Sequence, residues 1–251
     1  MNGIEIEPIP CLKDNYAYLI SRADSADAYV VDPSEAEPIV TALQRRSLTL
    51  RGILATHHHA DHVGGISDLV ARASAGALFV AGHALDRERI PAQTELVDVD
   101  TSGFTRTRLT LFGRTLLAMH IPGHTRAAIA WGIPDASNGD VPADVFTGDT
   151  LFGAGCGRLF EGTPAQMYAS LKALTAIPGT ARLWFGHEYT ESNLRFAATV
   201  EPDNRAIGER QGRLTPQTTP TTVALEKATN PFVRAASVEE LAARRAAKDK
   251  F

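Results

Sequence analysis

The sequence has little of what marks secreted, membrane-spanning or nucleic-acid-binding proteins. Two cysteines among 251 residues exclude a framework of several disulfides and are typical of a reducing cytosol. No apolar run approaches the roughly 18 residues of a membrane helix, and segment 1–10 has no Lys or Arg, so we expect no signal peptide. The net charge of −4 gives no general attraction to nucleic acid. We therefore expect a cytoplasmic protein that binds neither membranes nor nucleic acid.

What is present is the composition of an ordinary globular chain, with 44% hydrophobic and 22% charged residues. As far as residue 187, short apolar runs bounded by Gly, Pro, Asp or Ser alternate with helical patterns. Such runs predict strands in a mixed α/β fold. The expected strands are 4–9, 17–20, 29–31, 51–55, 77–80, 109–111, 115–119, 129–131, 145–147 and 181–185.

Two helices are expected within this α/β segment, and the sequence pattern changes after it. Ser34 is placed to cap a helix over 35–46, and Thr163 followed by Pro164 predicts a helix over 163–176. After His187 the sequence predicts no strand. It predicts helices at 191–200 and 238–247, separated by an exposed Thr/Pro-rich loop at 214–222. We therefore expect an α/β body over 1–187 and a small helical domain over 188–251.

Four of the eight histidines fall in the stretch from His57 to His62, directly after an expected strand. At a strand end, the period of two can point His57 and His59 the same way. Imidazole and the carboxylate of Asp61 are common ligands of divalent first-row metals. A solvated polar loop is the alternative, but the internal position and the preceding apolar strand argue against it.

Three further ligand-type residues each follow an apolar run and a glycine, namely His124, Asp149 and His187. A glycine allows the sharp turn that delivers a side chain at a sheet edge. Each signal alone is weak. With the histidine cluster they give seven candidate ligands, which is too many for one tetrahedral ion but suits two ions that share a carboxylate and a water.

The strings around these ligands resemble the metallo-β-lactamase superfamily: His57-X-His59-X-Asp61-His62, Pro122-Gly123-His124-Thr125, Thr147-Gly148-Asp149-Thr150 and Gly186-His187-Glu188. Within it, the chain closely resembles glyoxalase II, the hydroxyacylglutathione hydrolases. That narrower resemblance lies in residues 14–16, 148–158, 186–190, 230–232 and 248–251.

The resemblance implies an αββα sandwich whose C-terminal helical domain helps to bind glutathione. It also implies the roles of individual residues. His57, His59 and His124 would hold one metal, Asp61, His62 and His187 the other, and Asp149 would bridge them; Arg158, Tyr189, Arg245 and Lys248 would bind the substrate. Ala127-Ala128 and Phe160 depart from the family pattern. Without the resemblance, the basic run 244–250 would be read as a solvated helix face.

The implied activity is hydrolysis of S-(2-hydroxyacyl)glutathione, S-D-lactoylglutathione above all, in the second step of methylglyoxal detoxification. Two cations that share one water would lower its pKa toward 7 and supply a hydroxide at neutral pH. Asp61 and Asp149 are the expected catalytic carboxylates, and Asp61 could orient the hydroxide. Zinc is the expected metal, with iron or manganese as alternatives. We expect a monomer.

Other functions remain open at this stage. A persulfide dioxygenase-like enzyme with one iron shares the fold, but it would not need Asp61, His62 and His187 together. A lactonase or β-lactamase would leave the basic tail unexplained, and the net charge weighs against a nucleic-acid-processing member. The glycine-rich stretch 153–157 lacks the spacing of a nucleotide loop, so we expect a flexible loop beside the metals. The remaining candidates, Cys156, His58, His83, His120, Trp131 and Trp184, are expected to be structural or surface residues.

Overall fold

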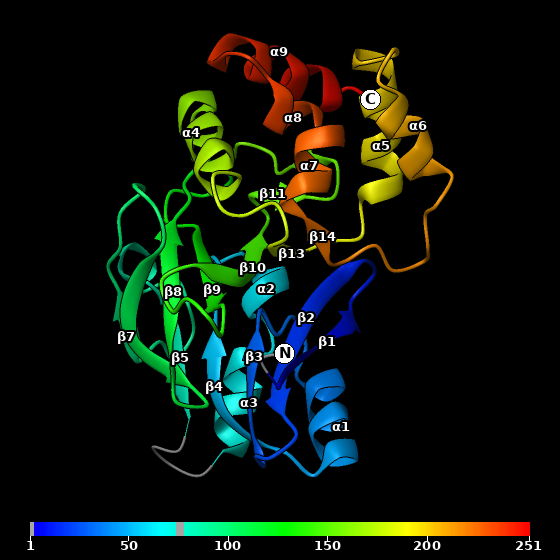
Figure 1. Cartoon of the computed structure of the whole chain (residues 1–251). Coiled ribbons are helices and arrows are strands. Elements are labelled where there is room, and N and C mark those ends of the chain that lie inside the picture. Colours follow the sequence, from blue (N-terminus) through cyan, green and yellow to red (C-terminus); the bar gives the residue numbers. More distant parts are fainter. Residues whose placement is uncertain (1–2, 74–77) are drawn as a thin grey trace.

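Two β-sheets face each other and carry helices on both outer faces, the expected αββα arrangement (Figure 1). Their central strands are therefore buried along nearly their whole length. The computed structural model describes residues 3–73 and 78–251. In the first sheet the strands are antiparallel from β1 to β3 and parallel from β3 to β6. In order across it, they are β1 (Ile4–Cys11), β2 (Asn15–Arg22), β3 (Asp27–Val31), β4 (Thr49–Leu54), β5 (Phe79–His83) and β6 (Glu95–Val97).

The second sheet is antiparallel except for the pair β10 and β13, which run parallel. Its strands, in order across the sheet, are β14 (Thr221–Thr222), β13 (Arg182–Phe185), β10 (Pro142–Gly148), β9 (Ile129–Pro134), β8 (Arg114–His120) and β7 (Thr105–Leu111). A separate two-stranded hairpin is formed by β11 (Leu151–Phe152) and β12 (Gly155–Cys156).

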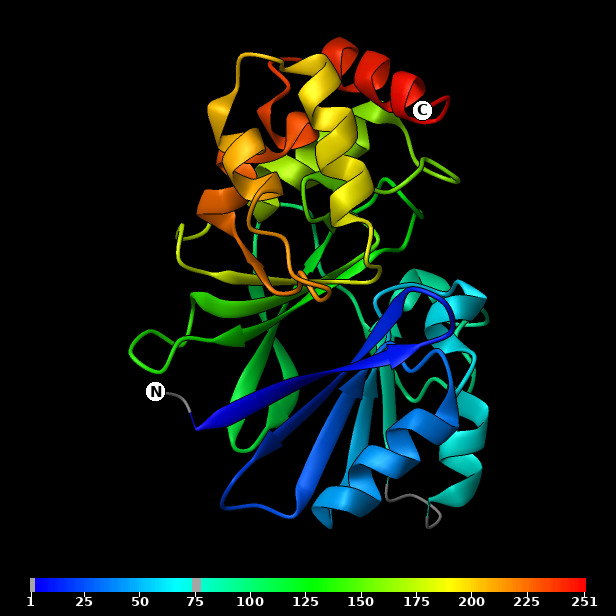
Figure 2. The same ribbon diagram turned by 90° about the vertical axis from the view of Figure 1, so that its right-hand side faces the viewer.

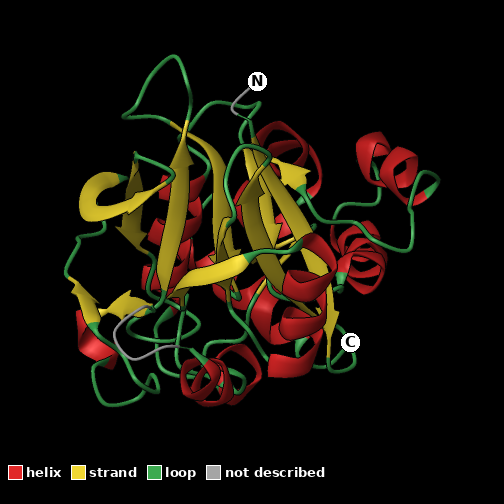
Figure 3. Ribbon diagram, turned by 90° about the horizontal axis from the view of Figure 1, so that it is seen from below, coloured by secondary structure: helices red, strands yellow, loops and turns green. Residues whose placement is uncertain are grey.

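Helices lie on both sides of the strands, as the view from below also shows (Figure 3). Those on the first sheet are α1 (Ala36–Arg46), α2 (Ala60–Val63) and α3 (Ile66–Arg72), with a short 3-10 helix η1 (Ala84–Asp86) after β5. Those at the second sheet are α4 (Pro164–Leu174), α5 (Thr190–Val200), α6 (Arg205–Gln211), α7 (Val223–Thr229), α8 (Pro231–Arg234) and α9 (Val238–Lys248). No helix in the described part of the chain has the length and apolar character needed to cross a bilayer.

Three apolar layers hold these elements together. The middle layer lies between the sheets and includes Tyr18, Leu54, Trp131 and Phe146. The outer layers bury α1 and α3 against the first sheet and α4, with the C-terminal helices, against the second. Turned by 90°, the structure shows α5 to α9 gathered at one end, above the edge of the sandwich (Figure 2).

Several local predictions were wrong, because tertiary contacts override local patterns. Ser34 does not cap α1; its hydroxyl donates to the carbonyl of Asp61 at 2.5 Å. A strand does occur after residue 187, since β14 pairs with β13. The expected loop 214–222 is not exposed throughout, because Thr219 and Thr221 are buried. By contrast, Thr163 caps α4 through a capping box, as predicted.

The other predicted strands and helices are found with shifted ends. The expected strand 77–80 corresponds to β5, and its first residue lies outside the described residues. The stretch 153–157 is buried and includes a strand of the β11–β12 hairpin, so the flexible loop predicted there was wrong.

Candidate metal centre and substrate pocket

Strand ends bring all seven candidate ligands to one rim of the sandwich. His57 and His59 follow β4, and the short helix α2 begins immediately afterwards, so that it carries Asp61 and His62. The other three come from the second sheet: His124 from the β8–β9 connection, and Asp149 and His187 from the ends of the parallel strands β10 and β13. Because parallel strands end at the same edge, residues 38 positions apart, at 149 and 187, come together.

The ligand atoms form two groups of three. His57, His59 and His124 make one group, and Asp61, His62 and His187 make the other. Within each group the ligand atoms all lie within 4.8 Å of one another. A third combination, Asp32 with His57 and His62, has the same compactness, but Asp32 binds the opposite ring nitrogen of His62.

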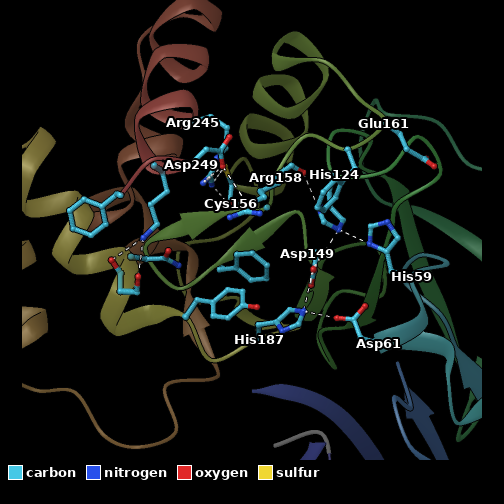
Figure 4. Close-up of a pocket in the computed structure, with 18 of the residues that line it drawn as sticks. His59, Asp61, His124, Asp149, Cys156, Arg158, Glu161, His187, Arg245 and Asp249 are labelled. Carbon is cyan, nitrogen blue, oxygen red and sulfur yellow. Dashed lines mark hydrogen bonds and ion pairs between the residues drawn. The ribbon is translucent and has the colours of Figure 1, made fainter. Parts of the chain in front are cut away.

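Asp149 lies between the two groups of three. One of its carboxylate oxygens is 3.5 Å from Nε2 of His124 and 3.3 Å from Nε2 of His187. The other is 3.2 Å from Nε2 of His62. A single carboxylate thus touches both groups, and the close-up shows it between His124 and His187 (Figure 4).

The ring nitrogens that face away from the cluster are held by the surrounding chain. Nδ1 of His62 donates to Asp32 at 2.9 Å, and Nδ1 of His124 donates to the carbonyl of Arg158 at 2.9 Å. Nδ1 of His187 donates to Asp14 at 2.8 Å. Such partners fix the tautomer and the ring orientation, so Nε2 is left to face the cluster.

The charges of the site divide between the two groups. Burial lowers the pKa of His57, His124 and His59, the last to about 4, and neighbouring histidines act in the same direction on His57 and His59. These three rings are therefore neutral, the form in which imidazole binds a metal.

The other group carries protons between its carboxylates. Burial opposes the charged form of His187, but Asp149 and Asp61 outweigh it and raise its pKa to about 10. Burial also disfavours ionised Asp149, yet His62 and His187 hold its pKa well below the usual range. His62 and His187 are thus protonated, and their positive charges balance the carboxylates as metal ions would. Metal binding would release these protons.

The donor set fits two metal ions. Nε2 of His62 and Oδ1 of Asp149 are buried and form an ion pair at 3.2 Å, but neither makes a hydrogen bond of good geometry among the described residues. Buried polar atoms without well-formed hydrogen bonds are costly, and such a pair inside a cluster of imidazoles suits metal coordination. The histidine and aspartate clusters are those of a dinuclear metal site.

A cavity of about 880 Å³ opens beside this cluster. Its lining includes His59, Asp61, His124, Asp149 and His187, and also three cationic residues, Arg158, Arg245 and Lys248. In Figure 4, Arg245 lies on the opposite side of the cavity from His59 and Asp61. Residues at the strand ends of both sheets and residues of the C-terminal helices therefore line the same cavity (Figure 4). Its volume suits a small ligand.

The four predicted substrate-binding residues all line this cavity, but their side chains differ in freedom. The Arg158 side chain is 65% exposed, and Tyr189 stacks on the His187 ring at 4.8 Å. Lys248 donates to the carbonyl and hydroxyl of Ser192 at 3.1 and 3.0 Å. Arg245 is buried and donates to the carbonyl of Cys156 at 2.7 Å.

Sequence reasoning missed residues that support the ligands. Asp32 directly follows the buried strand β3, as Asp149 follows β10, and it accepts from the backbone and hydroxyl of Thr56 and from His62. Asn15 donates to the carboxylate of Asp61 at 3.1 Å. An exposed ring at the cavity, Phe160, lies edge-on to His59 and His124. The resemblance to the family marks Phe160 as a departure from the pattern, but it does not predict the contact with these two rings.

The residues expected to be structural are found in such roles. Trp131 and Trp184 are buried between the sheets, and Cys156 is a buried free thiol. His83 is buried beside His120, with ring centroids 4.3 Å apart. His58 contacts the buried carboxylate of Asp86 at 3.2 Å.

Comparison with known proteins agrees with this geometry. The family model of the metallo-β-lactamase superfamily matches residues 13–187, and that of the hydroxyacylglutathione hydrolase C-terminus matches residues 188–251. A hydroxyacylglutathione hydrolase from Synechococcus is 46% identical over 92% of this chain and 89% of its own length. One from Cupriavidus metallidurans is 45% identical over 92% and 86%.

Solved structures share the fold. The di-iron-bound form of TTHA1623 superimposes with a TM-score of 0.62 and 27% identity, over 90% of this chain and 99% of that one. The sequence relatives, the family models and the shared fold agree. The chain therefore belongs to the hydroxyacylglutathione hydrolase family of the metallo-β-lactamase superfamily.

Proposed function

We propose that this chain hydrolyses the thioester of S-(2-hydroxyacyl)glutathione. S-D-lactoylglutathione is the main substrate, glutathione and D-lactate are the products, and the reaction is the second step of methylglyoxal detoxification. One observation carries the proposal: a cluster of imidazoles and carboxylates and a group of cationic side chains line the same cavity. The first suits thioester hydrolysis and the second suits the carboxylates of glutathione.

We assign the ligands as the two groups suggest. His57, His59 and His124 would hold one ion and Asp61, His62 and His187 the other, and Asp149 lies within reach of both groups. Zinc is the proposed metal, although iron and manganese accept the same donors. Divalent ions held there would supply a water of lowered pKa and would withdraw charge from the substrate carbonyl.

The protein's own groups hold the reactants. The Asp61 side chain is 41% exposed at the cavity; Asn15 donates to its carboxylate, and Ser34 donates to the backbone carbonyl of the same residue. We propose that it accepts a hydrogen bond from the attacking water and orients it toward the carbonyl carbon. The departing thiol has an ordinary pKa of about 8.5, so the sulfur can leave as thiolate without a general acid.

The far end of the cavity would bind the glutathione part. Arg158 offers a planar fork of donors to a carboxylate, and Lys248 offers a point charge. Arg245 adds positive charge from a buried position, and the ring of Tyr189, stacked on His187, also lines the cavity. Remote binding of this kind places the thioester at the metal cluster.

The test compares metal-free with metal-reconstituted protein on S-D-lactoylglutathione, following thioester loss and free thiol appearance. We expect hydrolysis to require metal, with two ions per chain at full activity. Glutathione persulfide is tested in parallel as a substrate, with oxygen uptake measured by an oxygen electrode. Oxygen uptake with one iron per chain, or intact thioester in the fully loaded protein, would contradict the proposal.

We further propose that the chain acts as a monomer in a reducing cytosol. Both of its cysteines, Cys11 and Cys156, are buried and free, which suits a compartment where thiols stay reduced. Sedimentation equilibrium at micromolar concentration tests the oligomeric state.

A further inference from the structure

The β11–β12 hairpin joins two parts of the metal centre. Its first strand starts two residues after Asp149, and its second strand ends just before Gly157. A Cβ on Gly157 would lie 2.1 Å from the carbonyl oxygen of Asp149 and 2.8 Å from Nδ1 of His124. The next residue, Arg158, supplies the carbonyl that accepts from that same His124 nitrogen. The position of the hairpin therefore sets the positions of two ligands.

Buried side chains of the C-terminal helices hold this hairpin through its backbone. Asn230 donates to the carbonyls of Gly155 and Phe152 at 2.9 and 3.4 Å. Further along the same backbone, the Asn193 amide donates to the carbonyl of Gly153 at 3.0 Å, and Glu226 accepts from the N–H of Ala154 at 2.8 Å. These contacts come from α5, α7 and the residue that caps α8.

Glu226 is the centre of this arrangement. It is fully buried and accepts from four donors: Ala154 N–H, the Thr221 hydroxyl, the Asn230 amide and the Arg210 guanidinium, at 2.7 to 2.9 Å. A buried carboxylate is retained at little cost only when it is paired and fully hydrogen-bonded.

The conformation of Ala154 shows what this carboxylate holds in place. Ala154 has φ +54°, a left-handed conformation that a non-glycine residue rarely adopts. Such a residue persists where its surroundings determine its geometry. Here the surroundings include the carboxylate of Glu226, which accepts the Ala154 N–H.

We propose that Glu226 and Asn230 are positioning residues for the metal centre, acting through the β11–β12 hairpin on Asp149 and His124. The C-terminal helices then have a second task besides contact with substrate, because they set how firmly the ions are held. The inference rests on the proposed ligand set, since it requires Asp149 and His124 to bind metal.

Two substitutions test it with little change in volume. Glu226→Gln replaces one of the two accepting oxygens with an amide NH2 group, which then faces the donors that this oxygen bound. Asn230→Asp keeps the oxygen that accepts from the N–H groups of Phe232 and Val233 at the start of α8. It removes the donor to the carbonyls of Gly155 and Phe152 and to the carboxylate of Glu226, and it sets an acceptor against all three.

Glu201→Gln is the matched control. Glu201 also accepts from two arginines and an asparagine in the helical region, namely Arg234, Arg244 and Asn204. None of its bonds among the described residues reaches the hairpin. Circular dichroism and thermal unfolding establish that each variant is folded at the temperature of measurement.

The readout is zinc affinity, measured by competition with a chromogenic chelator on the full-length protein. We expect Glu226→Gln and Asn230→Asp each to weaken it by about 10-fold or more, the usual effect of losing a ligand-supporting contact, while Glu201→Gln stays within about 2-fold of wild type. Wild-type affinity in a folded Asn230→Asp or Glu226→Gln variant would overturn the inference. A wild-type protein that holds zinc but does not cleave the thioester would contradict the proposed function alone, whereas one that binds none of zinc, iron and manganese would overturn both.

Discussion

The carboxylate of Asp14 accepts a hydrogen bond from Nδ1 of His187 at 2.8 Å, across 173 residues of sequence. The opposite nitrogen of the ring, Nε2, then lies 3.2 Å from Asp61 and 3.3 Å from Asp149. The neighbouring residue, Asn15, donates to Asp61. The turn between β1 and β2 therefore supports two ligands of the same group.

Asp14→Ala should weaken metal binding and kcat/KM by about 10- to 100-fold, because the His187 ring loses the acceptor that fixes its orientation. Asp14→Asn retains an acceptor oxygen and should recover part of the loss. Chelator competition and steady-state kinetics measure both effects. Asp24→Ala is the control, since Asp24 is 71% exposed and pairs only with Arg22 among the described residues. Equal behaviour of the Asp14 and Asp24 variants would contradict the assignment.

Asp61→Asn should lose metal and turnover together. The amide is a poorer ligand than the carboxylate, and its neutral group can no longer pair with the protonated form of His187. Metal analysis after dialysis is expected to show fewer than two ions per chain, and kcat should fall at least 10-fold. Unchanged turnover in a variant that keeps both ions would refute this role for Asp61.

Gly157→Ala should damage the metal centre without touching a ligand side chain. Its new Cβ would overlap the backbone of Asp149 and press on the His124 ring, so we expect metal affinity to fall by about 10-fold or more. Gly208→Ala is the matched control, because nothing lies within 4 Å of a Cβ there. It should be neutral or stabilise the helix by up to about 1 kcal/mol. Full metal retention in Gly157→Ala would show that the hairpin can move away.

Lys248→Ala should raise KM about 10-fold with little change in kcat, because a contact far from the thioester contributes mainly uniform binding. Arg245→Ala should raise KM as well. It should also lower the free energy of unfolding by about 1–3 kcal/mol, because the buried carbonyl of Cys156 loses its donor. Kinetics and urea titration separate these effects. If KM is unchanged in both variants, the final helix is a structural element only.

The affinity for substrate should fall as the pH rises through 8. Burial, helped by the charges of Arg245 and Arg195, lowers the pKa of Lys248 to about 8. The ammonium is thus largely present at pH 7 and about nine-tenths lost at pH 9. KM of the wild type should therefore approach that of Lys248→Ala at pH 9. Lys248→Arg keeps its charge, so its KM should change little over this range, and a parallel rise there would exclude Lys248 as the cause.

The strands and the ligand cluster could be predicted from sequence because both depend on local signals. Buried strands such as β4 and β10 are short apolar runs, and the ligands follow them directly. The resemblance to a known family supplied the division into two groups, and the structure brings the same residues together.

What could not be predicted depends on contacts between distant segments. Ser34 has the chemistry of a helix cap, but the carbonyl of Asp61 competes for its hydroxyl. The strand β14 has two residues and exists only because β13 lies beside it. The glycine-rich stretch before Arg158 resembles a flexible loop until Glu226 and Asn230, more than 70 residues away, bind its backbone.

The ligands are spread over 130 positions of the chain, from His57 to His187, and they come from both sheets. During synthesis, the first four therefore leave the ribosome well before β13, the strand that precedes His187. Until β13 joins the second sheet, the group of Asp61, His62 and His187 lacks its third ligand. Metal binding should accordingly follow the completion of folding, so that the ions stabilise the folded β-sandwich and do not nucleate its folding.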